Sequence, residues 1–156
     1  MQTDPKIVQI LNDTLTAELT AINQYFIHAK MCANWGYSRL ASHIREESID
    51  EMKHADIIIE RILFFDGVPN VQRLNPVKIG ETVPEQFHVD LELEYAAVKR
   101  LNDGIATCVA LGDNTTRALL EQILVSEEAH IDWLETQLEV IRQIGDAQYL
   151  AEQLHD

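Results

Sequence analysis

Cysteine is scarce in this sequence: its 156 residues include two, Cys32 and Cys108, and neither belongs to a Cys-x-x-Cys pair. A chain with so few thiols has no disulfide framework and no zinc site built from cysteines. The sequence therefore predicts a protein of a reducing compartment, the cytoplasm, in which both thiols are small buried core residues.

Long apolar runs are also missing. No uninterrupted apolar stretch approaches the roughly 18 residues that a membrane span requires. Residues 1–6 lack the basic and apolar regions of a signal peptide. We therefore expect neither a membrane segment nor a secretory signal in this chain.

Basic residues are few. Twelve Lys and Arg stand against 26 Asp and Glu, which gives a formal net charge of −14. This balance argues against nucleic-acid binding, because a protein that binds nucleic acid needs basic surface to neutralise phosphates. It is compatible with attraction of metal cations and equally with a well-solvated surface.

What the sequence does contain is four long segments with helical periodicity, which predict an all-α protein with a single domain, residues 1–156. Asp4 followed by Pro5 is typical of a helix start, and apolar residues then recur at helical spacing as far as Phe26. Glycines close several of the segments. The expected helices span about 5–34, 38–65, 82–111 and 115–144, followed by a short fifth helix at about 146–154.

One long connection interrupts this pattern. Residues 71–82 contain Pro76 and Gly80 and lack helical periodicity, and Thr82 with Glu85 is typical of a capping box that opens the third helix. The connection is too long for a tight turn, so it is expected to be a crossover that lets the second and third helices run parallel. We expect it to lie against the bundle through its apolar residues, which are Val71, Leu74, Val77 and Ile79.

Two Glu-x-x-His pairs are the most informative motif. In each half of the chain a lone glutamate precedes the pair by 33 residues, and the two halves repeat at an interval of 76 residues. Positions i and i+3 of a helix lie about 60° apart, so each pair can address one point. One glutamate on each of two helices and a Glu-x-x-His on each of two others is the ligand set of a di-iron carboxylate site. The residues are Glu18, Glu51, His54, Glu94, Glu127 and His130.

The alternative is a set of exposed or singly paired acids. Apolar residues flank all four glutamates at helical spacing, which places them on core-facing stripes. Four converging carboxylates without cations would repel one another, and an unpaired buried carboxylate costs several kcal/mol. Two divalent cations remove both problems. Mixed carboxylate and imidazole ligands favour iron or manganese, with zinc as a competitor.

Three further residues lie at helical spacing from the expected ligands. Asp50 precedes His54 by four residues and is expected to accept a hydrogen bond from its second ring nitrogen, and Ser126 stands in the same relation to His130. Tyr25 lies two turns after Glu18, close to the same helix face. Its hydroxyl is placed to bond a ligand carboxylate or to supply an electron, although an ordinary packed tyrosine is an equal alternative.

Several longer stretches resemble bacterioferritin, and the similarity covers nearly the whole chain. The resemblance implies a ferritin-like four-helix bundle in a hollow cage of 24 subunits. Such a cage oxidises Fe²⁺ with O₂ or H₂O₂ and stores an Fe³⁺ mineral. The six residues above coincide with the ferroxidase ligands of that family. The stretches are residues 21–26 (AINQYF), 47–56 (ESIDEMKHAD), 60–63 (ERIL) and 130–135 (HIDWLE).

Met52 follows Glu51, so it is turned about 100° from the metal-facing side and lies on the outside of the bundle. From the sequence alone, packing at a helix–helix interface is the better interpretation. The resemblance implies instead one haem b between two subunits, with Met52 from each as axial ligand. It also implies a bacterioferritin-associated ferredoxin as electron donor, and a cage made either of this chain alone or with a second, haem-free subunit.

The chain departs from the family at Glu46, where relatives often carry a histidine that binds iron on the inner wall together with Asp50. Glu46 and Asp50 share a helix face, which suits either a cation held by two carboxylates or a solvated acidic surface. Trp35 and Trp133 match aromatics near the electron routes of the family, and core packing would explain them equally well. The positions that match pore-lining residues of the family are Asn34, Asp66, Asn70, Asp132 and Thr136.

Other functions were weighed against ferroxidase activity. A rubrerythrin-like oxidoreductase would need a Cys-x-x-Cys pair, and an oxygenase would be expected in a longer chain. A haem-binding electron carrier or a passive storage shell predicts an impaired ligand set, whereas all six residues are present. A DNA-protecting mini-ferritin would lack the fifth helix and would carry a basic tail.

Overall fold

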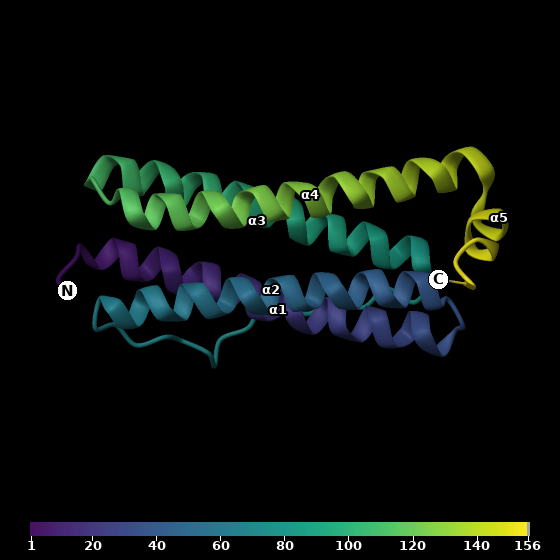
Figure 1. Ribbon diagram of the computed structural model, residues 1–156, viewed down its shortest axis with the longest axis horizontal. Helices are drawn as coiled ribbons and strands as arrows, with labels where there is room; N and C mark the ends of the chain where they lie inside the picture. The colour runs from purple at the N-terminus through teal and green to yellow at the C-terminus, as the bar shows by residue number, and fades with distance from the viewer. Residues whose placement is uncertain (156) are drawn as a thin grey trace.

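A computed structural model describes residues 1–155. Every regular element among them is a helix, so the expected all-α class is confirmed. Helices α1 and α2 form one antiparallel pair and α3 and α4 a second, and a short α5 closes one end of the bundle (Figure 1). The crossover returns the chain along the bundle, so α2 and α3 run parallel. The bounds are Pro5–Asn34 for α1, Ser38–Phe64 for α2, Val83–Leu111 for α3, Asn114–Ile144 for α4 and Asp146–Ala151 for α5.

Side-chain caps fix three of the helix starts. Asp4 accepts a hydrogen bond from the amide of Lys6, and Asp113 accepts one from the amide of Thr116. At α3 the Thr82 hydroxyl accepts from the Glu85 amide, as the capping box requires. The returning bond differs, because the Glu85 carboxylate accepts from the amide of Glu81 and not from that of Thr82. The fifth helix ends at Ala151, three residues before the expected end.

The core is divided into two apolar blocks. One block lies toward the α3–α4 turn and includes Leu11, Ile58 and Leu120, whereas the other lies toward α5 and includes Ile44 and Phe87. Each block holds one of the two free cysteines, both buried as expected. The six expected ligands fall between the two blocks along every long helix. Phe26, the last residue of the apolar repeat on α1, is 48% exposed and lies outside the core.

The crossover lies against the bundle, but through polar and not through apolar contacts. Its apolar residues Val71, Leu74, Val77 and Ile79 are all exposed. Instead, every fourth residue of one α1 face hydrogen-bonds to the segment that follows α2. The side chains of Asn12, Thr16, Thr20, Gln24 and His28 contact, in that order, Asn70, Arg73, Asn75, Lys78 and Gly80. This polar ladder holds the crossover in register with α1.

A buried network fixes the far end of the crossover. The Gly80 amide donates to His28 Nε2 at 3.0 Å, so His28 Nδ1 carries the proton and donates to Asp90 Oδ1 at 2.9 Å. Gln24 donates to the same carboxylate oxygen of Asp90. His28 is completely buried and Asp90 nearly so. The network therefore ties α1, the crossover and α3 together in the apolar block near α5.

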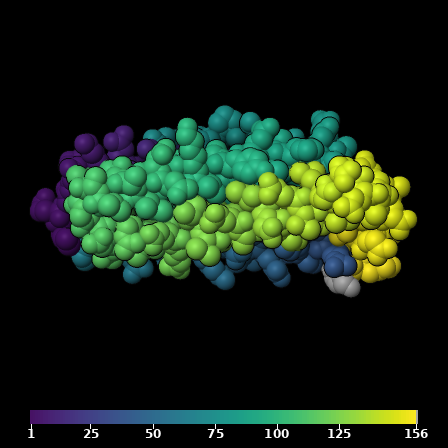
Figure 2. Space-filling model, turned by 90° about the horizontal axis from the view of Figure 1, so that it is seen from above, coloured from purple at the N-terminus to yellow at the C-terminus, as the bar shows by residue number. Residues whose placement is uncertain are grey.

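Figure 2 looks down on the elongated face formed by α3 and α4, with α5 and the C-terminal residues at one end. In residues 1–155 no helix combines the length and the apolar character needed to span a bilayer.

Candidate metal centre

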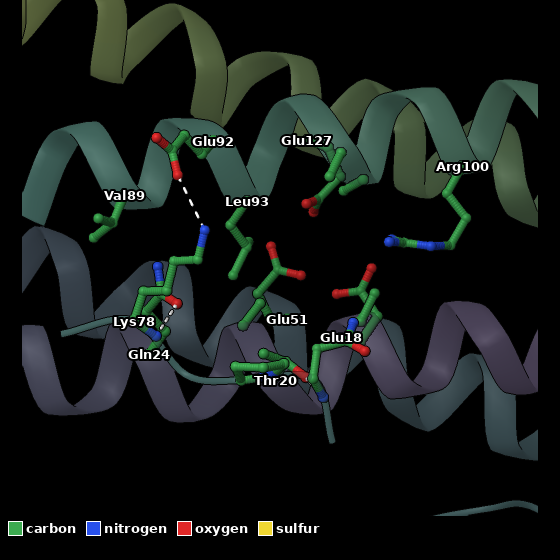
Figure 3. A pocket seen from close by; sticks show the side chains of 16 residues that line it. Glu18, Thr20, Gln24, Glu51, Lys78, Val89, Glu92, Leu93, Arg100 and Glu127 are labelled. Carbon is green, nitrogen blue, oxygen red and sulfur yellow. Dashed lines mark hydrogen bonds and ion pairs between the residues drawn. The ribbon is translucent and has the colours of Figure 1, made fainter. Parts of the chain in front are cut away.

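Six buried side chains from all four long helices meet between the two apolar blocks. Glu18 comes from α1, Glu51 and His54 from α2, Glu94 from α3, and Glu127 and His130 from α4. None is more than 8% exposed, and Glu51 and Glu94 are completely buried. Figure 3 shows three of them, Glu18, Glu51 and Glu127, directed toward a common space.

The six residues form two overlapping groups of four. Glu18, Glu51, His54 and Glu127 offer ligand atoms that all lie within 4.8 Å of one another, and so do Glu51, Glu94, Glu127 and His130. Glu51 and Glu127 belong to both groups. The arrangement could therefore hold two metal ions, each with one imidazole and one carboxylate of its own, bridged by the two shared carboxylates.

Several buried polar atoms at this centre have no hydrogen-bond partner within the protein. His54 Nδ1 lies 3.5 Å from Glu18 and 3.3 Å from Glu127, and His130 Nδ1 lies 3.1 Å from Glu51, yet none of these contacts is aligned as a hydrogen bond. Buried polar atoms without partners are rare in native proteins and point to a missing ligand. The atoms concerned are Glu18 Oε2, both Glu51 oxygens, His54 Nδ1, Glu94 Oε2, Glu127 Oε1 and His130 Nδ1.

The charges at the centre oppose one another in the metal-free protein. Burial, together with the charges of Glu94 and Glu51, raises the pKa of Glu127 well above its ordinary value, and burial also raises the pKa of Glu94. For Glu51 burial acts in the same direction, but the facing imidazoles of His130 and His54 outweigh it and hold the pKa at about 2. Burial lowers the pKa of His130, but contacts with Glu51 and Glu94 raise it to about 11. Without metal, protons therefore take the place of cations.

Metal binding at this centre should consequently depend steeply on pH. A metal ion displaces protons from Glu127 and His130, both of which have raised pKa values, so the affinity is expected to increase with pH. Each released proton contributes about a tenfold change per pH unit. Calorimetric titration with Zn²⁺ at pH 5.5, 6.5 and 7.5 measures how the affinity changes with pH. Repeating it in two buffers of different ionisation enthalpy gives the number of protons released. An affinity independent of pH would contradict the arrangement of charges described here.

Tyr25 supports the centre from α1. It is 1% exposed, and its hydroxyl donates a short hydrogen bond to Glu94 Oε1, which is one of the two roles expected from its position. Burial, reinforced by the charge of Glu94, raises the pKa of Tyr25 well above its ordinary value. Tyr25 therefore remains a neutral donor that orients the Glu94 carboxylate.

The expected partners of the two histidines need correction. Asp50 was expected beside His54, but its Oδ2 lies 3.4 Å from Nε2 of His130, the nitrogen for which Ser126 was expected as partner. The reason is the packing of α2 against α4, which brings Asp50 across to the histidine of the neighbouring helix. A contact between helices of this kind cannot be found from spacing within one helix.

A histidine–glutamate pair that the sequence did not predict lies next to the centre on α2. His43 Nε2 lies 2.7 Å from Glu47 Oε1, and the His43 ring stacks on Trp133 with centroids 3.8 Å apart. Glu47 is 3% exposed, and burial raises its pKa. Glu46 is exposed, whereas Asp50 is drawn to His130. The signal that could have found Glu47 is its position four residues before Glu51, on the same face of α2.

The remaining candidate residues lie on the surface. Met52 is 55% exposed on α2 and Trp35 is 37% exposed. Asn70 has a structural role, because its side chain accepts from the amides of Gln72 and Arg73 and shapes the start of the crossover. The other positions that match family pores are all exposed: Asn34, Asp66, Asp132 and Thr136.

A four-helix bundle with a long crossover, enclosing two overlapping carboxylate–histidine groups, defines a ferritin-like metalloprotein. Comparison with known proteins agrees, since a family model described as a ferritin-like domain matches residues 8–144. The chain is 52% identical over 152 residues to bacterioferritin BfrA of Mycobacterium tuberculosis, covering 97% of this chain and 96% of that protein. It is 53% identical over 152 residues to bacterioferritin of Mycolicibacterium paratuberculosis, again covering 97% of this chain and 96% of that protein. It is 50% identical over 151 residues to bacterioferritin of Streptomyces coelicolor, covering 97% of this chain and 90% of that protein.

The chain therefore belongs to the bacterioferritins within the ferritin-like family. Family membership supports a role in iron storage, and the two overlapping groups fit a metal site.

Proposed function

We propose that this protein stores iron and that its intrabundle centre is a ferroxidase, which oxidises Fe²⁺ to Fe³⁺ with O₂ or H₂O₂. The observation that carries the proposal is the pair of four-residue groups that share Glu51 and Glu127. Sharing brings two Fe²⁺ ions close enough to deliver two electrons to one oxidant molecule, which limits the release of one-electron radicals.

Charge balance favours two divalent ions at the centre. Two Fe²⁺ ions carry four positive charges and compensate the four carboxylates, so the repulsion that raises the pKa of Glu127 disappears. Glu18 and His54 would hold one iron, Glu94 and His130 the other, and the two shared carboxylates would bridge them. The Tyr25 hydroxyl fixes the orientation of Glu94, and Asp50 faces the outer nitrogen of His130.

The test is aerobic addition of Fe²⁺ to the metal-free protein, with Fe³⁺ absorbance as the readout. Wild type should show a fast phase that saturates at two irons per subunit. Glu18→Ala and Glu94→Ala each remove a carboxylate that belongs to one metal position alone, so both should lose the fast phase. Equal slow rates in all three proteins would instead support a passive storage shell or a haem-binding electron carrier.

Haem is proposed on the outside of α2. Met52 is 55% exposed, and Ile49, three residues earlier on the same face of α2, is a second exposed apolar side chain. An exposed thioether in an apolar surface suits axial ligation of haem iron, and a two-fold dimer supplies two such ligands. A haem b shared by two subunits would supply electron transfer for the release of stored iron.

Replacing Met52 should separate haem binding from iron oxidation. Met52→Leu keeps the apolar surface but removes the sulfur, so haem absorbance should be lost while the fast phase of Fe²⁺ oxidation persists. Met31→Leu is the matched control, because Met31 is half-buried on α1 and its sulfur contacts Gln86. Haem retained in Met52→Leu would contradict the assignment. The measurement is the ratio of haem to protein absorbance after reconstitution.

The same proposal includes assembly into the 24-subunit cage that the resemblance implies, in the cytoplasm, with a small ferredoxin as reductant. Large apolar side chains near the α3–α4 turn, such as Leu63, Phe64 and Val109, are half exposed and would be covered by neighbouring copies. Sedimentation velocity of the purified protein tests the assembly. Co-expression with a haem-free subunit tests whether the cage can be mixed.

A further inference from the structure

A cavity beside the metal centre opens between α1, α3 and the crossover. Its volume is about 210 Å³, and Glu18, Glu51 and Glu127 form part of its wall. Much of the remaining wall comes from small side chains, among them Ala21 and Ala97, which leave the space open. Figure 3 shows the three glutamates directed toward a common space, with Arg100 reaching toward it from α3. The cavity therefore connects the ferroxidase ligands with a cationic side chain that is not a metal ligand.

Arg100 has no partner in the protein. Among residues 1–155 no hydrogen bond or ion pair involves its guanidinium. The charge of Asp13 attracts Arg100, but Arg73 already binds that carboxylate at 2.7 Å. The other cation at the cavity, Lys78, pairs with Glu92 at 3.3 Å. Arg100 is half-buried and lines the cavity without a paired carboxylate, so an anion is the partner that it lacks.

The charge that Arg100 faces depends on whether the centre holds metal. Without metal, the acidic side chains of Glu18, Glu51 and Glu127 offer an anion no positive partner on their side of the cavity. Two divalent ions would neutralise the four carboxylates of the centre. The guanidinium of Arg100 would then be uncompensated beside a neutral wall, and an anion would become favourable.

Size and geometry restrict the anion. A cavity of about 210 Å³ has room for a tetrahedral oxyanion together with several water molecules. The guanidinium presents a planar fork of donors that matches two phosphate oxygens. We propose that this cavity binds a small oxyanion of the phosphate class between Arg100 and the metal-loaded centre. The inference rests on the proposed metal centre and adds a ligand to it.

Binding of this kind couples phosphate to metal. If phosphate binds only when the metals are present, it must also tighten the retention of the metals by the same factor. Phosphate concentration would then regulate how long iron stays at the centre before it moves to the mineral.

The test uses protein loaded with Co²⁺, a redox-stable and paramagnetic substitute for Fe²⁺, and freed of excess metal. Visible absorbance of Co²⁺ first establishes whether two ions are bound per subunit. Inorganic phosphate is then titrated, and the ³¹P line width is measured, because a phosphate next to Co²⁺ is broadened. The variant is Arg100→Gln. The control is Arg73→Gln, which makes the same substitution at an arginine that is ion-paired with Asp13.

Wild type and Arg73→Gln should show saturable broadening of the ³¹P line, and the metal-free protein should show none. Arg100→Gln should bind phosphate at least tenfold more weakly, because a charge-assisted bidentate contact is lost. Equal broadening in Arg100→Gln and wild type, or broadening that does not saturate, would overturn the inference and leave the metal centre intact. Failure to bind two Co²⁺ ions would count against the proposed ferroxidase centre itself and would remove the basis of the phosphate site.

Discussion

Glu127→Gln is expected to stabilise the metal-free protein and at the same time to abolish fast iron oxidation. Glu127 is 1% exposed, and burial with the charges of Glu94 and Glu51 raises its pKa well above the ordinary value. An amide of the same shape removes this buried ionisable group, so the free energy of unfolding should rise by about 1–3 kcal/mol at neutral pH. The oxidation rate should fall at least about 100-fold, because both metal positions lose a ligand.

The stability difference should grow with pH. A carboxyl group with a raised pKa binds its proton more tightly in the folded than in the unfolded protein. Wild type therefore loses stability as pH rises from the ordinary glutamate pKa, about 4.3, through the raised value in the folded state. Glu127→Gln lacks the part of this loss that comes from Glu127. Urea unfolding of both proteins at pH 5 and pH 8, with chelator present, measures the difference.

Glu128→Gln is the matched control, since its side chain is exposed on the next position of α4. It should change neither stability nor oxidation rate by more than a small amount. Addition of Zn²⁺ should reverse the order of stability, because wild type gains the binding energy of the metal and Glu127→Gln gains much less. A Glu127→Gln protein that oxidises Fe²⁺ at the wild-type rate would exclude Glu127 as a bridging ligand.

Gly80→Ala is expected to give the largest loss of stability away from the metal centre. A Cβ atom at this position would lie 2.3 Å from the backbone nitrogen of Gln86 and 2.6 Å from its Cα, so the crossover or the start of α3 must move. Movement would break the bond from the Gly80 amide to His28, which is completely buried, and would leave the imidazole unsatisfied. Overpacking and the lost bond together should cost about 3 kcal/mol or more.

For a chain of this length, about 3 kcal/mol corresponds to a decrease of roughly 6–12 °C in the melting temperature. Thermal unfolding followed by circular dichroism provides the measurement. Gly36→Ala is the control: its Cβ would meet nothing within 4 Å, and only its φ of +91° opposes the substitution. The control should therefore lose about 1–2 kcal/mol. Equal losses in the two variants would show that the close approach of Gly80 to Gln86 is not what holds the crossover.

The sequence was informative wherever a pattern lies within one helix. The spacing of Glu51 and His54, and of Glu127 and His130, places each pair on one helix face whatever the rest of the fold does. Apolar residues on the same faces direct those pairs inward, so the sequence predicted the bundle and the residues that the structure brings together. The side-chain caps of Asp4 and Thr82 are equally local and both form, although the returning bond of the capping box goes to the amide of Glu81.

The sequence by itself thus determined the helices, their inward faces and the six side chains that converge, because helical periodicity fixes all three. The tertiary structure alone decided what those faces meet. It assigned Asp50 to His130, held the crossover through a polar ladder on α1, and left Arg100 without a partner beside the cavity. These features depend on how neighbouring helices are placed, and contacts between segments distant in sequence leave no periodic signal along the chain.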